Sequence, residues 1–165
     1  MFPSPYNQQL TVKFKQLTPT AKLPTAAHEY GDAGFDLYAD TTITLPVGKA
    51  TMVPTGLQLA DCPFTITSDD RSAYFLDVRS RSGLSQKLVF PVTGTVDVAY
   101  RGEIKVILAN LGAEDYLVKA GDRIAQLVIQ KIMVNTPGFN MVSFEFTDKV
   151  VETHRGGTGF GSSGR

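Results

Sequence analysis

The chain has 165 residues, which corresponds to one domain and is long enough to bury a hydrophobic core. Its 16 basic and 16 acidic residues cancel, which argues against a general nucleic-acid-binding protein but leaves room for a locally basic site. The single Cys62 excludes a disulfide framework, and two histidines, His28 and His154, are too few for a zinc cluster, so we expect any metal to be held mainly by oxygen atoms.

The N-terminal residues lack the apolar core of a signal peptide, and no segment has the apolar run of a membrane-spanning helix. The sequence therefore predicts a soluble, intracellular protein with neither a membrane nor a nucleic-acid partner. We expect a cytoplasmic location, with the nucleus or a virus-infected host cell left open.

Short runs of alternating apolar and polar residues follow one another along the chain, separated by Gly, Pro, Asp and Asn. Such runs, rich in Val, Ile, Thr and Phe, are typical of the strands of an all-β barrel or sandwich. An apolar strand is expected within residues 32–39. The other predicted strands are residues 10–14, 42–45, 52–59, 73–78, 88–92, 103–110, 116–118, 124–133 and 142–146.

Two segments depart from this pattern of strands. A single helix is expected at residues 82–87, with Ser82 as its N-terminal cap. Residues 61–72 are polar and rich in turn-forming residues, which predicts a hairpin or a protruding loop. This loop is also a possible site for an unknown partner.

Two segments of the first half of the chain suggest chemistry. Asp36 places a carboxylate inside the apolar strand at 32–39, and a turn or edge carboxylate is an equally good reading of it. Residues 79–85 place two arginines and three serines at the start of the predicted helix, which is a natural anion site. A solvated loop is the alternative for this second segment.

Two further segments lie in the second half. Residues 94–102 form a predicted β-hairpin bounded by glycines, in which Asp97 can act as a general base on water and the Tyr100 ring can pack against a sugar. Residues 119–127 form a tight turn that enters an apolar strand. In that turn, Asp122 and Arg123 are expected to have a structural role, while Gln126 reaches outward.

The C-terminal segment, residues 155–165, contains five glycines among its eleven residues, together with Arg155 and the aromatic Phe160. Glycines allow the backbone to approach a ligand, arginine binds phosphate, and an aromatic ring can cover a base. The composition indicates a flexible lid that closes on a nucleotide. A disordered tail has the same composition, so this segment alone leaves both readings open.

Taken in this order, the five segments resemble the five motifs of the trimeric dUTPase family, the dUTP nucleotidohydrolases, over residues 33–164. The resemblance implies a distorted β-barrel or jelly-roll-like protomer at residues 1–154, a flexible C-terminal lid at 155–165, and a homotrimer with active sites at the subunit boundaries. It also implies Mg2+-assisted hydrolysis of dUTP to dUMP and pyrophosphate, which limits uracil in DNA and supplies dUMP for thymidylate synthesis.

The same resemblance implies roles for individual residues. Asp97 corresponds to the carboxylate that activates the attacking water, Tyr100 to the tyrosine that excludes a 2′-hydroxyl, and Asp36 to a carboxylate that bears on Mg2+ through water. The remaining substrate-binding residues that it implies are Arg81, Ser82, Gly83 and Gln126 at the phosphates, Gly94 and Val96 at the base, and Arg155, Phe160, Gly161, Ser162 and Ser163 in the lid.

The sequence also departs from the family pattern. Ala99 stands where many members have a second Asp, and Pro91, which has no N–H, lies near a residue that contacts uracil in some relatives. A related activity, dCTP deamination, requires a glutamate on the following strand, where Ile107 stands here. A catalytically idle barrel with a binding role is the alternative from another class.

Overall fold

The structure is a computed structural model that describes residues 11–28, 31–62, 72–92, 94–97, 99–133 and 145–147. Residues Met1–Val134 form one compact unit, and Asn135–Arg165 form a second. Within the second unit the described residues, 145–147, form neither helix nor strand. In the described ranges, no helix has the length and apolar character needed to span a membrane.

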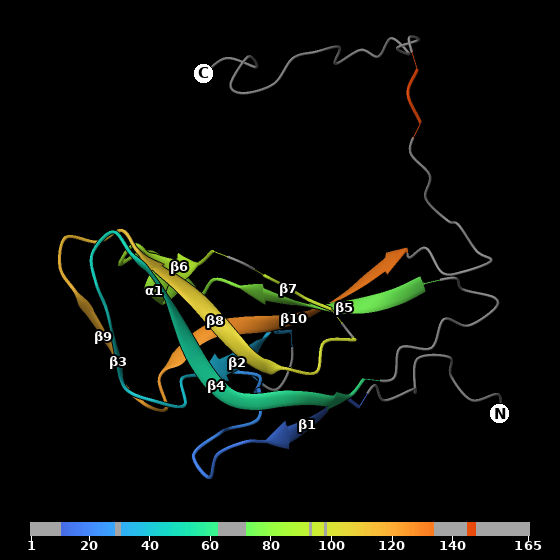
Figure 1. Cartoon of the computed structure of the whole chain (residues 1–165), viewed down its shortest axis with the longest axis horizontal. Coiled ribbons are helices and arrows are strands. Elements are labelled where there is room, and N and C mark those ends of the chain that lie inside the picture. The colour runs from blue at the N-terminus through green and yellow to red at the C-terminus, as the bar shows by residue number, and fades with distance from the viewer. Residues whose placement is uncertain are drawn as a thin grey trace. The chain divides into compact units, whose positions relative to one another are not determined.

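The first unit is built almost entirely from strands, as the sequence predicts (Figure 1). Strands have formed at each predicted position from residues 10–14 to 124–133, with ends displaced by a few residues. The elements are β1 (Lys13–Gln16), β2 (Phe35–Tyr38), β3 (Ile43–Leu45), β4 (Ala50–Asp61), β5 (Ser72–Arg79), α1 (Ser82–Ser85), β6 (Val89–Pro91), β7 (Thr95–Val96), β8 (Glu103–Asn110), β9 (Tyr116–Val118) and β10 (Arg123–Met133).

The predicted strand at residues 142–146 has no counterpart in its described part. Glu145 and Phe146 do not lie in a strand, and residues 142–144 lie outside the described residues.

The strands form two four-stranded sheets and one two-stranded sheet. The strand orders are β1-β4-β8-β6, β2-β10-β5-β7 and β3-β9, and every pairing between named strands is antiparallel. None of the three sheets closes on itself through the described strands. The all-β, jelly-roll-like fold is therefore confirmed, in the form of open sheets around a shared core.

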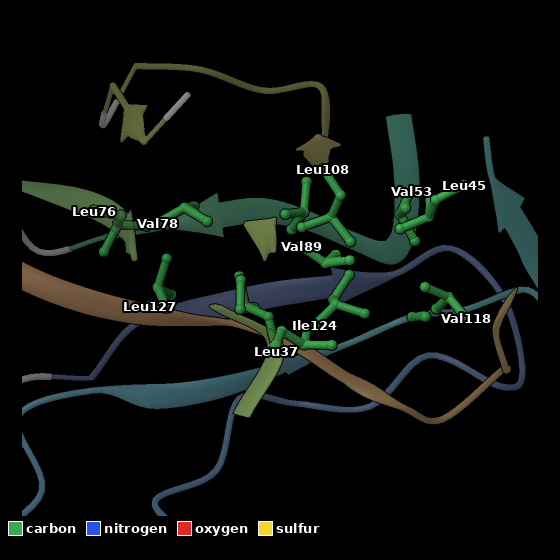
Figure 2. Packing of buried hydrophobic residues seen from close by; sticks show 14 of the residues in the cluster. Leu37, Leu45, Val53, Leu76, Val78, Val89, Leu108, Val118, Ile124 and Leu127 are labelled. Atoms are coloured by element: carbon green, nitrogen blue, oxygen red, sulfur yellow. The ribbon is translucent and has the colours of Figure 1, made fainter. Parts of the chain in front are cut away.

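The hydrophobic core joins all three sheets. On β8 the apolar residues Ile104, Val106 and Leu108 are buried while Lys105 between them is exposed, which is the period of two expected of a strand with one face on the core. Side chains from both large sheets and from the β3-β9 pair form one cluster (Figure 2). Labelled members of this cluster are Leu37, Leu76, Val78, Ile124 and Leu127 of one large sheet, Val53, Val89 and Leu108 of the other, and Leu45 and Val118 of the pair.

The helix is shorter than predicted, and its cap is a different residue. Arg81 has extended backbone (φ −99°, ψ 134°) and is the N-cap, with no capping hydrogen bond from its side chain, so Ser82 is already the first helical residue. The helix ends at Ser85 because the chain turns into β6. Leu88 there adopts a left-handed conformation (φ 57°), and its N–H donates to the carbonyl of Ser85 (2.9 Å).

The predicted hairpin at residues 94–102 is wrong, although its turn has formed. The N–H of Tyr100 donates to the carbonyl of Asp97 (2.9 Å). However, β7 pairs with β5, whereas β8 pairs with β4 and β6 in the other large sheet. The chain therefore crosses between the sheets here, because the partner of each strand is set by the core and not by the nearest strand in the sequence.

The segment at 61–72 also connects different sheets. It follows β4 in one large sheet and leads to β5 in the other, so it does not join two paired strands. Residues 63–71 of the predicted loop lie outside the described residues.

Asn110 fixes the loop between β8 and β9. This residue is 1% exposed, and its amide nitrogen donates to the carbonyls of Leu45 (2.8 Å) and Glu114 (2.9 Å). Its amide oxygen accepts the N–H of Gly112 (2.9 Å). One buried side chain thus satisfies three backbone groups of the loop and of β3.

Replacing Asn110 with Ala is expected to lower the free energy of unfolding by about 2–4 kcal/mol, because buried polar groups lose their partners. Denaturation by urea measures this change. Thr44→Ala on the neighbouring β3, at an exposed position, serves as the control and is expected to change stability by no more than about 0.5 kcal/mol. A loss below about 1 kcal/mol for Asn110→Ala would contradict this account of the loop.

Candidate active site

Asp36 lies at the centre of a charged cluster formed by three separate segments. It is 1% exposed and lies on β2, where Gln126 of β10 is its cross-strand neighbour. Its Oδ1 accepts the Nε–H of Arg81 (2.8 Å), and its Oδ2 accepts an Nη1–H of Arg123 (3.2 Å). Asp36 does lie on an edge strand of its sheet, but it is buried, and each of its oxygens accepts a hydrogen bond from a guanidinium group.

These two arginines line a polar cleft of about 420 Å³, which we call the basic cleft. It has three cationic side chains, Arg81, Arg123 and Lys87, and the Lys87 ammonium lies 5.1 Å from the centre of the Tyr116 ring. With Asp36 behind it and Asp122 in its wall, the cleft carries a net charge of +1 (three positive, two negative). The complete lining is Arg81, Gly83, Leu84, Lys87, Tyr116, Val118, Asp122, Arg123 and Ile124.

The residues predicted to bind phosphate are only partly gathered in this cleft. Arg81 and Gly83 line it, whereas Ser82 is exposed on α1 and is not part of the lining. Gln126 is half-buried on β10 and is not part of the lining either. A Cβ placed on Gly34 would lie 3.1 Å from the Cβ of Gln126, so the glycine leaves room for that side chain.

Arg123, which lines the cleft, has a different contact from the one that the sequence predicts. The pattern at 119–127 predicts that Arg123 ties the turn, but its guanidinium contacts Asp36. Asp122 does fasten the turn, since its Oδ2 accepts the N–H of Lys119 (2.8 Å). Arg123 is the first residue of β10, so the predicted strand placed it correctly at the edge of the turn. Its partner could not be predicted in the same way, because Asp36 lies 87 positions away in the sequence.

Asp97 and Tyr100 lie together in a second cleft of about 280 Å³, which we call the Asp97 cleft. Asp97 is exposed, and the Tyr100 ring is 46% exposed. Val96, predicted at the base, also lines this cleft. The complete lining is Met52, Thr95, Val96, Asp97, Tyr100, Glu103, Ile104, Lys105 and Ile107.

Tyr100 is held against the backbone at the start of β8. Its hydroxyl donates to the carbonyl of Glu103 (3.1 Å), and a Cβ placed on Gly102 would lie 2.5 Å from its Cζ. Only glycine at position 102 therefore allows this placement of the ring. The hydroxyl end of the ring is held by this hydrogen bond, while the residue is about half exposed, so ring surface is available for contact with a flat or cyclic ligand.

Gly94 is placed by β5 and not by the Asp97 cleft. Its carbonyl accepts the N–H of Val78 (2.6 Å), and an added Cβ would lie 2.7 Å from an Asp77 oxygen. The glycine thus allows the close approach of this segment to β5. It is not among the residues that line the cleft.

The basic cleft and the Asp97 cleft share no lining residue. Of the predicted phosphate contacts, Arg81 and Gly83 therefore line a different cleft from the one that Asp97 lines. The five predicted lid residues, Arg155, Phe160, Gly161, Ser162 and Ser163, lie outside the described residues.

The described residues do not form a protein cage for a metal ion. Across the ranges that the structure describes, no three His, Cys, Asp or Glu side chains gather at one point. Both Asp36 oxygens accept hydrogen bonds, although a carboxylate has about four lone-pair positions and can accept a further one from a metal-bound water. This donor set fits an ion whose direct ligands are ligand phosphates and water.

Comparison with known proteins identifies the family. The family model described as dUTPase matches residues 20–164. The deoxyuridine 5'-triphosphate nucleotidohydrolase of Solibacter usitatus is 38% identical over 161 residues, which are 95% of this chain and 98% of that protein.

Two solved structures show the same fold. The dUTPase of Staphylococcus bacteriophage 80alpha with dUPNHPP has a TM-score of 0.67 at 26% identity and covers 94% of this chain and 99% of its own. A mutant dUTPase from phage phi11 of S. aureus, solved with a structural Mg(II) ion, has a TM-score of 0.64 at 22% identity and covers 84% and 99%. With a family model and a full-length relative in agreement, the chain belongs to the dUTPase family.

Proposed function

We propose that this protein hydrolyses dUTP to dUMP and pyrophosphate by attack of an Asp97-activated water on the α-phosphorus. The observation that supports this most directly is the Asp97 cleft, which places an exposed carboxylate beside an open tyrosine face. The basic cleft supplies the complementary site for an anion. In the cell, this activity limits uracil incorporation into DNA and provides dUMP for thymidylate synthesis.

In this mechanism, the Asp97 carboxylate accepts a proton from water and so creates the nucleophile. The water oxygen attacks the α-phosphorus in line and forms a new P–O bond. The bond between the α-phosphorus and the α,β-bridging oxygen breaks, and pyrophosphate leaves with that oxygen and the bonding electron pair. Arg81, together with the backbone around Ser82 and Gly83, stabilises the charge that develops on the phosphate oxygens. Gln126 is proposed as a further polar contact to the phosphates.

The Asp97 cleft is the proposed site for the sugar and the base. The fixed Tyr100 ring packs on deoxyribose and leaves no room for a 2′-hydroxyl. Backbone groups between Val92 and Tyr100, with Val96 among them, are proposed to read the uracil edge. Gly94 is outside the lining of this cleft, and its carbonyl accepts the N–H of Val78, so its proposed role is to shape the segment. Ile107 in this lining argues against deamination, and Glu103 is already engaged by the N–H of Gly56 (2.9 Å) and by Lys105 (3.5 Å).

Assembly as a homotrimer is proposed from the family resemblance, and the distribution of the predicted site residues over two clefts agrees with it. A nucleoside triphosphate needs the base site and the phosphate site at the same time, but one copy of the chain presents them as clefts without a common residue. We propose that the basic cleft of one subunit meets the Asp97 cleft of another. The C-terminal segment of a third subunit then supplies Arg155 and Phe160 to the same site.

We propose Mg2+ as the cofactor, held mainly by the triphosphate oxygens and by water, with Asp36 in contact through a water molecule. When bound, such an ion neutralises charge on the phosphates. The structural Mg(II) ion named for the phage phi11 dUTPase belongs to that protein. For this chain, the proposal rests on the preference of Mg2+ for oxygen ligands, which the phosphates, water and the Asp36 carboxylate provide.

The substrate range tests the proposed function. With Mg2+ present, dUTP is expected to yield dUMP and pyrophosphate, while dTTP, dCTP and UTP are far poorer substrates. A narrow base site rejects the 5-methyl group, its backbone groups select uracil over cytosine, and Tyr100 rejects the ribose hydroxyl. Pyrophosphate release from each nucleotide is the measurement, and equal rates for dTTP and dUTP would contradict the proposal.

A further inference from the structure

Asp36 is buried and paired with two arginines, an arrangement that a role in metal binding alone does not require. The carboxylate is 1% exposed, and each of its oxygens accepts one guanidinium N–H. A buried carboxylate is costly unless it is paired and hydrogen-bonded, and here two cations from distant segments provide the pairing. The arrangement fixes three side chains at once.

Arg81 is held at two points of its guanidinium group. Its Nε–H donates to Asp36 (2.8 Å), and its Nη1 donates to the carbonyl of Arg123 (3.2 Å). A guanidinium has five N–H donors in a rigid plane, so these two bonds fix the direction of the remaining three. Because Arg81 lines the basic cleft and its side chain is 22% exposed, a ligand in that cleft can reach the remaining donors.

Arg123 has a complementary role. Its side chain is 48% exposed, and the contact with Oδ2 of Asp36 uses one of its five N–H donors. Arg123 is bound to Oδ2, whereas Arg81 is bound to Oδ1, so the two guanidinium groups lie on different oxygens of the carboxylate. Arg123 also lines the basic cleft, so its own charge faces the same ligand.

We infer that Asp36 is a positioning residue that orients the Arg81 guanidinium toward phosphate, and that Arg123 is a further phosphate-binding residue of the basic cleft. This inference rests on the proposed function, because it assigns the basic cleft to the triphosphate. It differs from an effect through Mg2+, since the arginines contact phosphate without a metal. It also differs from a purely Coulombic effect of the Asp36 charge, which would oppose the binding of an anion.

Asp36→Asn separates these explanations by the sign of its effect. Removing a negative charge from behind the cleft favours anion binding by Coulomb's law alone. If Asp36 orients the arginines, the variant instead weakens binding, because the amide offers an acceptor to one guanidinium and a donor to the other. If Asp36 acts on Mg2+ alone, binding in the absence of metal does not change.

The experiment measures binding of inorganic tripolyphosphate to the full chain in EDTA by calorimetry. Asp36→Asn is expected to weaken binding about 10- to 100-fold, the range for losing charge-assisted hydrogen bonds. Arg123→Gln is expected to weaken tripolyphosphate binding about tenfold. Arg123→Lys is expected to retain most of the wild-type affinity, because a lysine can bind the same carboxylate oxygen. Lys13→Gln, which removes a positive charge on β1 that is paired with Asp61, is the control and is expected to bind like the wild type.

Unchanged or tighter binding by Asp36→Asn in EDTA would overturn the positioning role. If Asp36→Asn does not fold, as judged by its thermal transition, the variants Arg123→Gln and Arg123→Lys test the inference instead. Binding of tripolyphosphate by Arg123→Gln with the affinity of the wild type would then overturn it. Absence of tripolyphosphate binding by the wild type would also overturn it. Hydrolysis of dUTP by the wild type is measured separately, so that failure of the proposed function with an intact tripolyphosphate response is recognised as a different result.

Discussion

Asp97→Asn is expected to lower kcat for dUTP hydrolysis by about 10²–10⁴-fold, the usual loss when a general base is removed. The amide has nearly the same shape as the carboxylate but cannot take a proton from water. Asp97 is exposed, and the described contact at this position is made by its backbone carbonyl, so the variant should keep its fold. Nucleotide affinity should change little, because the side chain acts on water and not on the substrate.

Steady-state kinetics and binding of a non-hydrolysable dUTP analogue measure the two effects separately. Asp61→Asn is the matched control, since it neutralises an exposed carboxylate on β4 that lies outside the lining of both clefts. A near wild-type kcat for Asp97→Asn would show that another group is the base. Glu103 would be examined next, because it is the other carboxylate in the lining of the Asp97 cleft.

Removing residues 155–165 is expected to lower dUTP hydrolysis by orders of magnitude while leaving a folded oligomer. The deletion removes the proposed phosphate ligand Arg155 and the proposed uracil cover Phe160, together with Gly161, Ser162 and Ser163. The segment supplies one large apolar side chain, so little core can be lost with it. Phe160→Ala in the full chain is expected to be milder, at about 1–3 kcal/mol in binding, the range for one aromatic–base contact.

Activity, thermal denaturation and sedimentation of the truncated protein give the three readouts. Limited proteolysis of the full chain, with and without the dUTP analogue and Mg2+, tests closure directly, because a lid is protected when it covers a ligand. Cleavage within residues 155–165 at equal rates in both conditions would contradict the lid. Full activity of the truncated protein would contradict it as well.

Local patterns in the sequence were enough to predict the class of fold and the position of most strands. Alternation of apolar and polar residues is a local property, and it predicted β8 at residues 103–110 and β9 at residues 116–118 to the residue. Five ordered motifs likewise sufficed to identify the dUTPase family. The sequence correctly predicted that Asp97 and Tyr100 lie near each other, because they are three positions apart. A turn joins them, and both side chains line the same cleft.

The pairing of the strands and the partners of the charged side chains could be learned only from the folded chain. The turn at residues 97–100 looked like part of a hairpin, but β7 and β8 belong to different sheets because each strand pairs where its apolar face meets the core. Asp36 and Arg123 are 87 positions apart, and no local pattern indicates that β2 and β10 bring them together. Contacts between distant segments depend on strand register, which the whole core fixes, and this is why the charged cluster became visible only in the folded chain.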